Sequence, residues 1–146
     1  MQWEIIPFIG MGPIRFGISP AEVTAIIGPP ESTDDDDGYL SEYRAVELPI
    51  VSYEKNVVTE IEAFYDVENV TFRGRRIFDE PGLAIIQFLE QENGGARMNV
   101  GTVLFKDIGI TAGRLDEGTR GDHSVTAFAQ GLWDDRIGRF KELTFL

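Results

Sequence analysis

The alternation of apolar and polar positions predicts β-strands through most of the chain. Runs rich in β-branched and aromatic residues are bounded by short polar or glycine-containing segments, which is the pattern of strands joined by turns. The predicted strands span residues 39–46, 50–54, 57–66, 69–73, 76–78, 100–105 and 123–130. Lys55-Asn56 separates two of these runs and fits a tight hairpin turn.

The strand predicted at residues 57–66 has two different faces, because successive side chains in a strand point to opposite sides. The face expected to meet the core carries Val57, Thr59, Ile61, Ala63 and Tyr65. The other face carries the acidic residues Glu60, Glu62 and Asp66, together with Val58 and Phe64. We therefore expect one core side and one acidic side that is available for contact.

The sequence Ser19-Pro20-Ala21-Glu22 predicts the start of a first helix. Ser19 and Glu22 have the spacing of a capping box, and Pro20 falls at the first helical position, where its missing N–H costs nothing. The predicted buried face consists of Val23, Ile26 and Ile27, and the helix is expected to stop at Gly28 before Pro29-Pro30. The preceding Gly10-Met11-Gly12 lacks the third glycine of a phosphate-binding loop.

A second helix is predicted from Asp79, as its cap, to Asn93-Gly94-Gly95. Pro81 falls in its first turn, and Leu83, Ile86 and Leu89 form an apolar stripe with Ile85 and Phe88 beside it. Gln87, Glu90 and Gln91 are expected to face water. The sequence contains no internal linker. It therefore predicts one α+β domain over residues 1–146, with a mostly antiparallel sheet of about six strands and two short helices packed on one side.

The net charge of the chain indicates which kinds of partner the protein can bind. The chain has 25 acidic and 13 basic residues, a net charge of −12 and no cysteine. Such a field repels nucleic acid and anionic membranes and attracts basic partners, although it also serves plain solubility. Residues 1–7 lack the pattern of a signal peptide, and no apolar run reaches the ~18 residues of a membrane span. We expect a cytoplasmic protein that binds neither nucleic acid nor membrane.

No catalytic site, metal site or cofactor is predicted. The run Asp34–Asp37 before Gly38 resembles an EF-hand loop, but Arg44 stands where the bidentate glutamate belongs, so a solvated charge run in an exposed loop is expected. The single histidine, His123, has Asp122 and Ser124 as chain neighbours, and neighbours in a strand point apart, so they cannot form a triad by adjacency.

The sequence Trp133-Asp134-Asp135 follows the last predicted strand and combines an aromatic ring with two acids. This combination fits a contact patch for a basic protein. The alternative, which the sequence favours locally, is that Trp133 is a core residue and the two aspartates form a turn. The predicted partner-binding residues are Glu60, Glu62, Asp66, Trp133, Asp134 and Asp135.

The pattern FGISPAEVTAIIGPP, followed by strands such as VTEIEAFYD, resembles small bacterial immunity proteins of polymorphic toxin systems. It is also similar to the helix signature of the SmpA/OmlA and β-lactamase-inhibitor-like group. The resemblance carries no chemistry and assigns no functional residue, and the absence of an export signal favours its cytoplasmic immunity branch. It implies a binding protein whose partner is a toxin domain.

Three functions remain open at this stage. The first is an immunity or inhibitor protein that covers a basic toxin domain through acidic and aromatic patches. The second is an accessory or structural domain, and the third is an enzyme, for which no nucleophile, base or metal arrangement is visible in the sequence.

Overall fold

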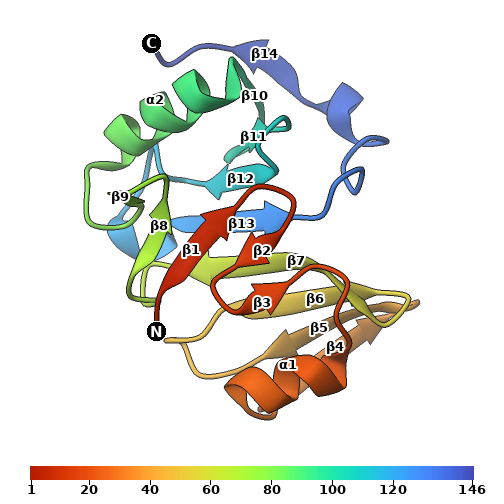
Figure 1. The fold of residues 1–146 in the computed structure, drawn as a ribbon. Coiled ribbons are helices and arrows are strands. Elements are labelled where there is room, and N and C mark those ends of the chain that lie inside the picture. The colour runs from red at the N-terminus through yellow and green to blue at the C-terminus, as the bar shows by residue number, and fades with distance from the viewer.

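The protein is described here from a computed structural model that covers residues 1–146 (Figure 1). The strands are β1 (Trp3–Ile6), β2 (Gly10–Met11), β3 (Ile14–Arg15), β4 (Ser32–Asp36), β5 (Tyr39–Tyr43), β6 (Ile50–Glu54), β7 (Val57–Phe64), β8 (Val70–Phe72), β9 (Arg75–Arg76), β10 (Ala96–Asn99), β11 (Thr102–Phe105), β12 (Ile110–Gly113), β13 (Ser124–Phe128) and β14 (Lys141–Leu143). The α-helices are α1 (Pro20–Ile27) and α2 (Gly82–Asn93), and two single 3₁₀ turns span Arg120–Asp122 and Ile137–Arg139.

The main sheet has nine strands in the order β14-β10-β11-β12-β13-β7-β6-β5-β4, and every neighbouring pair is antiparallel. The α+β class and the antiparallel pairing are as predicted, but the expected six strands were too few. The run Asp34–Asp37, expected as a loop, supplies most of the edge strand β4 and its turn. Its carboxylates point into water on both faces of an edge strand, so a strand forms there without an apolar pattern.

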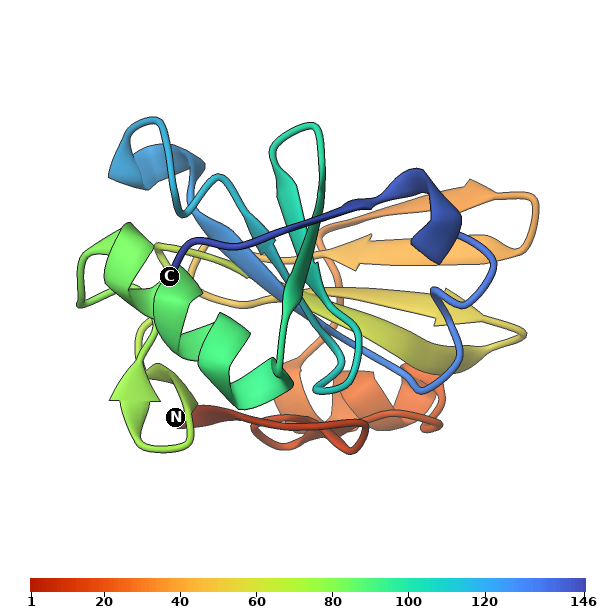
Figure 2. The same cartoon turned by 90° about the horizontal axis from the view of Figure 1, so that it is seen from above.

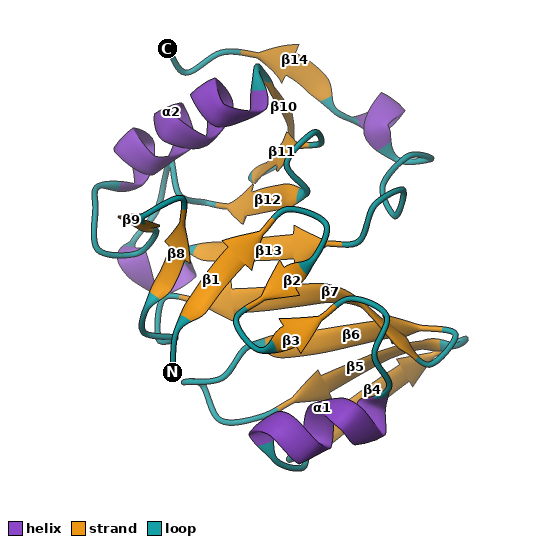
Figure 3. Ribbon diagram, viewed as in Figure 1, coloured by secondary structure: helices purple, strands orange, loops and turns teal.

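A second sheet of five short strands has the order β3-β2-β1-β8-β9. Its centre is a parallel pairing of β1 with β8, with Trp3 opposite Val70. Together with α1 and α2, this sheet covers one face of the nine-stranded sheet. Figures 2 and 3 show both helices and β1 to β3 on that side, while the tip of the β10–β11 hairpin projects from the other side. A core of 27 buried residues fills the space between these layers.

The order of elements occurs twice along the chain. A short hairpin, a helix and four antiparallel strands appear first as β2–β3, α1 and β4 to β7, and again as β8–β9, α2 and β10 to β13. The last strands of the two sets, β7 and β13, pair with each other, so the sheet order reads outward in the same way from its centre. The topology therefore has approximate two-fold symmetry, and we call the sheet strands β4 to β7 the first half and β10 to β13 the second half.

The first helix forms largely as predicted. Ser19 Oγ accepts a hydrogen bond from the backbone N–H of Glu22 at 3.2 Å, and the Glu22 carboxylate accepts one from the Ser19 N–H at 3.2 Å, which completes the capping box. Val23 is fully buried, and Ile27 packs against the core. Ile26, however, is 41% exposed, because a helix of two turns offers only a narrow stripe to the sheet.

The second helix departs from prediction at three positions. It begins after Pro81, and no side chain caps it, so Asp79 instead pairs with Arg76. Leu83 is 50% exposed, and Glu90 is buried although water was expected on its side. Glu90 Oε1 accepts a hydrogen bond from the N–H of Phe145 at 2.7 Å, and its Oε2 accepts one from the Thr144 hydroxyl at 2.6 Å. The C-terminal residues thus occupy the face of α2 that was expected to meet solvent.

A β-bulge changes the predicted faces of β7. Ser52 pairs with Glu60, but the next residue, Tyr53, pairs with Val58, so Thr59 is the extra residue on β7. The shift turns Val58 into the core, where it is 1% exposed, and leaves Val57 at the surface with 37% exposed. The prediction that Val57 faces the core and Val58 faces the acids was therefore wrong, whereas Ile61 and Ala63 are buried as expected.

Neither α-helix has the length and apolar composition that crossing a membrane requires.

Candidate functional site

The second face of the nine-stranded sheet, opposite the helices, is left partly open. Because side chains alternate along each strand, the pairing register identifies the residues on this face. Glu60 lies opposite Ser52 and Phe128, and Glu62 lies opposite Ile50 and Thr126. We call the side chains of this face on the first half the open face; they are Ser32, Asp34, Asp36, Tyr39, Ser41, Tyr43, Ile50, Ser52, Glu54, Val57, Glu60, Glu62 and Phe64.

Two carboxylates lie near the centre of the open face. Both Glu60 and Glu62 are half-buried, because neighbouring side chains on the three central strands crowd around them. The Tyr39 hydroxyl donates a hydrogen bond to Glu60, and the hydroxyls of Ser41 and Ser52 bond each other at 2.9 Å. The sheet therefore presents two acids within a polar surround rather than an apolar layer.

Burial changes the protonation of these groups. Loss of solvent raises the pKa of Glu62, and the nearby negative charge of Glu60 raises it further. Burial also raises the pKa of Glu60, although the Tyr39 hydroxyl and the positive charge of Arg136 oppose the rise. Burial and the Glu60 carboxylate raise the pKa of Tyr39 above its usual value, so the phenol stays protonated. The open face thus holds two carboxylates that gain from the approach of a cation.

Aromatic side chains stand beside these acids. Tyr43 and Phe64 are each 37% exposed on the open face, which is large for rings that are otherwise held in strands. Tyrosine and phenylalanine together with carboxylates are frequent in surfaces that bind proteins, because the rings supply apolar area and the charges supply specificity.

The same face of the second half is covered. Residues 129–140 fold back over it, and Leu104, Phe128 and Phe140 form a small buried cluster there. The Trp133 ring packs against this cluster, 5.9 Å from Phe128 and 5.7 Å from Phe140 between ring centroids. The side chain of Trp133 is therefore half-buried among other rings, as the core alternative in the sequence expected.

Phe64 and Phe128 make the contrast between the halves direct. Glu62 and Thr126 lie opposite each other at the centre of the sheet, and each phenylalanine stands two residues further along its own strand. The approximate two-fold symmetry therefore relates the two rings. Phe128 is 2% exposed under residues 129–140, whereas Phe64 is 37% exposed. Its equivalent cover is missing within this chain.

The structure brings some of the predicted site residues together and separates others. Glu60 and Glu62 share the open face, and Trp133 reaches the same side of the sheet through Phe128. Asp66 lies beyond the end of β7, in a pocket of about 550 Å³ shared with Arg76 and Arg120. Asp134 and Asp135 are exposed in a turn. Asp66 is thus not part of the open face.

Four residues that lie in or beside the site were not predicted from the sequence. Tyr39 and Tyr43 lie on the open face, and Arg136 lies with its guanidinium carbon 5.1 Å from the centre of the Trp133 ring. Phe64 was placed on the acidic face but given no role. The alternation of Tyr39, Ser41 and Tyr43 in the strand predicted at residues 39–46 was a usable signal for the tyrosines. The position of Arg136 depends on the fold-back of residues 129–140, which no local pattern encodes.

The other candidates for chemistry stay apart. His123 Nε2 lies 3.3 Å from the backbone carbonyl oxygen of Glu117, and Asp122 bonds Thr119 instead of the histidine. No group of three or more histidine, aspartate or glutamate side chains has the arrangement of a metal site. The absence of a bound metal or cofactor stays a prediction from the sequence.

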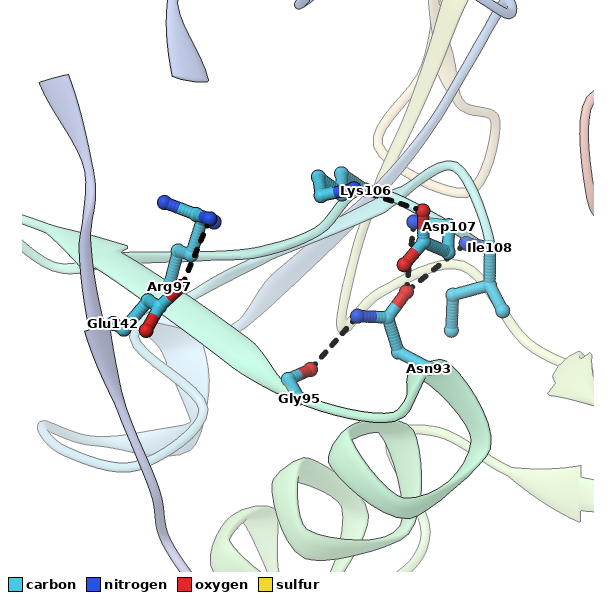
Figure 4. Close-up of polar contacts among 7 residues, drawn as sticks. All are labelled: Asn93, Gly95, Arg97, Lys106, Asp107, Ile108 and Glu142. Carbon is cyan, nitrogen blue, oxygen red and sulfur yellow. Dashed lines mark hydrogen bonds and ion pairs between the residues drawn. The ribbon is translucent and has the colours of Figure 1, made fainter. Parts of the chain in front are cut away.

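A pocket of about 250 Å³ lies at the far end of the second half, and its polar groups bond one another (Figure 4). Asn93 Oδ1 accepts hydrogen bonds from the N–H groups of Asp107 at 2.8 Å and Ile108 at 3.1 Å, while its amide donates to the Gly95 carbonyl at 2.8 Å. Arg97 pairs with Glu142 at 3.0 Å in the same region. The Asn93 contacts tie the end of α2 to the β11–β12 turn.

Comparison of the chain with family models, with curated protein sequences and with solved structures gives no match.

Proposed function

We propose that the protein is a binding protein whose open face docks onto a basic protein, with an immunity-type inhibitor of a toxin domain as the function. The observation that carries this proposal is the exposed Phe64, whose symmetry-related counterpart Phe128 is covered by residues 129–140. An element of the partner would cover the first half as that segment covers the second.

Charge determines the kind of partner. The open face carries Asp34, Asp36, Glu54, Glu60 and Glu62, and the whole chain has a net charge of −12. Arginine or lysine side chains that approach Glu60 and Glu62 would stabilise carboxylates that burial has made costly. The long-range field would also speed the encounter with a basic protein.

The resemblance of the first helix and its following strands to immunity proteins supports a toxin domain as the partner. A toxin that acts on nucleic acid or on another anionic substrate carries a basic groove, and an acidic sheet face would block it directly. The accessory-domain alternative shares the fold but requires no such partner.

The first experiment is co-expression of the protein with the gene beside its own, followed by a pull-down at low salt. Protection of the cells and recovery of the neighbour's product as a one-to-one complex would support the proposal. Full toxicity in the presence of the protein, with no complex, would contradict it and favour an accessory domain.

The second experiment locates the contact. In the Glu60→Gln/Glu62→Gln double variant we expect association to slow at low salt, and in Phe64→Ala we expect dissociation to quicken at a cost of about 2 kcal/mol in binding. The control is Glu4→Gln/Glu68→Gln, which removes the same charge from exposed positions outside the open face. Equal losses in test and control variants would show that net charge alone, and not the open face, governs binding.

A further inference from the structure

A second pocket, of about 370 Å³, lies between the β10–β11 turn and the segment that covers the second half. Its lining residues are Asn99, Val100, Thr102, Trp133, Arg136, Arg139 and Phe140. The only ionisable side chains among them are the two arginines. In a chain with a net charge of −12, a pocket with positive charge and no carboxylate in its lining is unexpected.

The two arginines make few ion pairs within the protein. Arg139 makes no ion pair, and the one ion pair of Arg136 is with Asp135, at 4.0 Å, whose side chain is 85% exposed. Ion pairs of that length between exposed groups contribute little. The charge of Arg136 also acts on Glu60 of the open face, but no ion pair joins these two side chains. The Trp133 ring, 5.1 Å away, holds the Arg136 guanidinium in place through a cation–π contact. Both guanidinium groups thus remain available as donors to an anion.

The hairpin side of the pocket carries one strained apolar residue, Val100, between the polar residues Asn99 and Thr102. Val100 is 90% exposed at the hairpin turn and has a φ of 33°, in the left-handed region that β-branched residues avoid. Sequence alone would favour Asn or Gly there. Strained backbone positions cluster at ligand-binding sites, and this one lies at the mouth of a pocket.

We propose that this pocket binds an organic carboxylate: Arg136 and Arg139 hold the carboxylate group, and Val100, Trp133 and Phe140 contact the apolar body that carries it. Asn99 and Thr102 add neutral hydrogen-bonding groups. The site adjoins the open face, because the charge of Arg136 also acts on Glu60, but it does not rest on the proposed function. A free small acid and the C-terminus of a peptide share this chemistry, and the experiment separates them.

The two tryptophans provide the readout. Trp3 is 2% exposed in the core and belongs to the other side of the sheet, so its indole N–H resonance is an internal reference for the fold. Trp133 Nε1 makes no hydrogen bond within the protein, so its resonance reports on changes at the pocket. We expect 4-phenylbutyrate to shift the Trp133 signal of ¹⁵N-labelled protein saturably, while the neutral 4-phenylbutanol does not.

Variants test the assigned roles. Arg139→Gln should weaken phenylbutyrate binding tenfold or more, whereas Arg15→Gln, which removes an exposed arginine that also makes no ion pair, should leave it unchanged. Val100→Asn suits the left-handed conformation and should weaken binding several-fold through loss of apolar contact. An unchanged Trp3 signal in each variant shows that the fold is retained.

The results of these experiments distinguish a peptide C-terminus from a free small acid as the ligand, and they can also contradict the proposal. Tighter binding of N-acetyl-Ala-Phe as the free acid than of phenylbutyrate, with no binding of its amide, assigns the pocket to a peptide C-terminus, and the reverse order assigns it to a free small acid. The proposal is overturned if the alcohol binds as well as the acid, if inorganic phosphate binds as tightly as phenylbutyrate, or if Arg139→Gln binds normally. None of these results depends on a partner of the open face.

Discussion

The two halves of the large sheet have the same topology but treat the face opposite the helices differently. In the second half residues 129–140 cover it, and Leu104, Phe128 and Phe140 are buried there. In the first half Glu60, Glu62, Tyr43 and Phe64 occupy related positions without any cover. A sheet face is therefore stable either with apolar residues under a covering segment or with polar residues in water.

The two halves also differ in how their faces affect the stability of the fold. The covered half satisfies its own apolar area, and the open half keeps two partly desolvated acids that reduce stability at neutral pH. Side chains that reduce the stability of the fold are common at functional sites.

The largest expected effect on stability distinguishes the two symmetry-related phenylalanines, Phe128 and Phe64. Phe128→Ala removes the centre of the covered cluster, where Phe8 and Trp133 also contact the ring, and should cost about 3–5 kcal/mol of unfolding free energy. Phe64→Ala should cost about 1 kcal/mol or less, because the ring is already 37% exposed. Urea denaturation of both variants measures the difference. Equal losses would show that Phe64 is as structural as Phe128.

The two hairpin turns offer a second contrast. Asp37-Gly38 joins β4 to β5 and Val100-Gly101 joins β10 to β11, and all four residues have positive φ, as in type I′ turns. Val100→Asn should raise the unfolding free energy by about 1 kcal/mol, because Asn-Gly is the preferred dipeptide, and Asp37→Val should lower it by a similar amount. Thermal unfolding of the two variants gives the result; a loss in Val100→Asn would mean that the valine side chain stabilises the tip.

The acids of the open half predict a pH dependence. The pKa of Glu62 is raised in the folded state, so the folded protein holds this proton more tightly than the unfolded chain does. Stability contributed by the protonated form is therefore lost as the pH rises from about the ordinary value of 4.5 through the raised pKa. Glu62→Gln should become more stable than the natural protein across that window.

The measurement is the difference in unfolding free energy between the Glu62→Gln variant and the natural protein from pH 4 to pH 8. Glu4→Gln, which removes an exposed acid on β1, is the control for the loss of one negative charge. A difference for Glu62→Gln that varies with pH no more than that of the control would contradict the burial argument.

The smallest effect on stability is expected for His123, in the long loop that joins β12 to β13. The related connection of the first half, between β6 and β7, is a short turn. His123→Gln should change the unfolding free energy by no more than about 0.5 kcal/mol, since the only hydrogen bond of the imidazole ring joins Nε2 to the Glu117 carbonyl oxygen at 3.3 Å. Partner binding should stay within a few-fold. A hundredfold loss of a measured activity in the folded variant would instead favour an enzyme.

Local signals predicted local features well. The capping box of α1 and the strand Ile50–Glu54 occur at the predicted residues, because caps and alternation act over a few positions. The main sheet has nine strands instead of about six, because β4, β10, β12 and β14 were not predicted. The edge strand β4 is polar throughout and has no apolar pattern, whereas the short β12 is almost entirely buried and has no alternation. The β1–β8 pairing joins residues 3 and 70, and no local pattern encodes such a contact.

The site was predictable only in part, for the same reason. Alternation placed Glu60, Glu62 and Phe64 on one face, and the structure agrees. The bulge at Thr59 reversed Val57 and Val58, because an extra residue in one strand depends on its pairing with another. The basic pocket requires the hairpin tip and residues 133–140 to meet, and only the tertiary fold brings them together.

The acidic edge strand β4 has a consequence for how molecules of this protein meet one another in solution. Its outer backbone groups have no neighbouring strand, so they are free to pair with an edge of another molecule. At neutral pH the exposed Asp34, Asp35 and Asp36 repel any such approach. Replacement of these three aspartates by asparagine removes that repulsion. The colloidal stability of a concentrated sample of the variant should then fall, and light scattering should rise while the circular dichroism signal of the folded chain is kept.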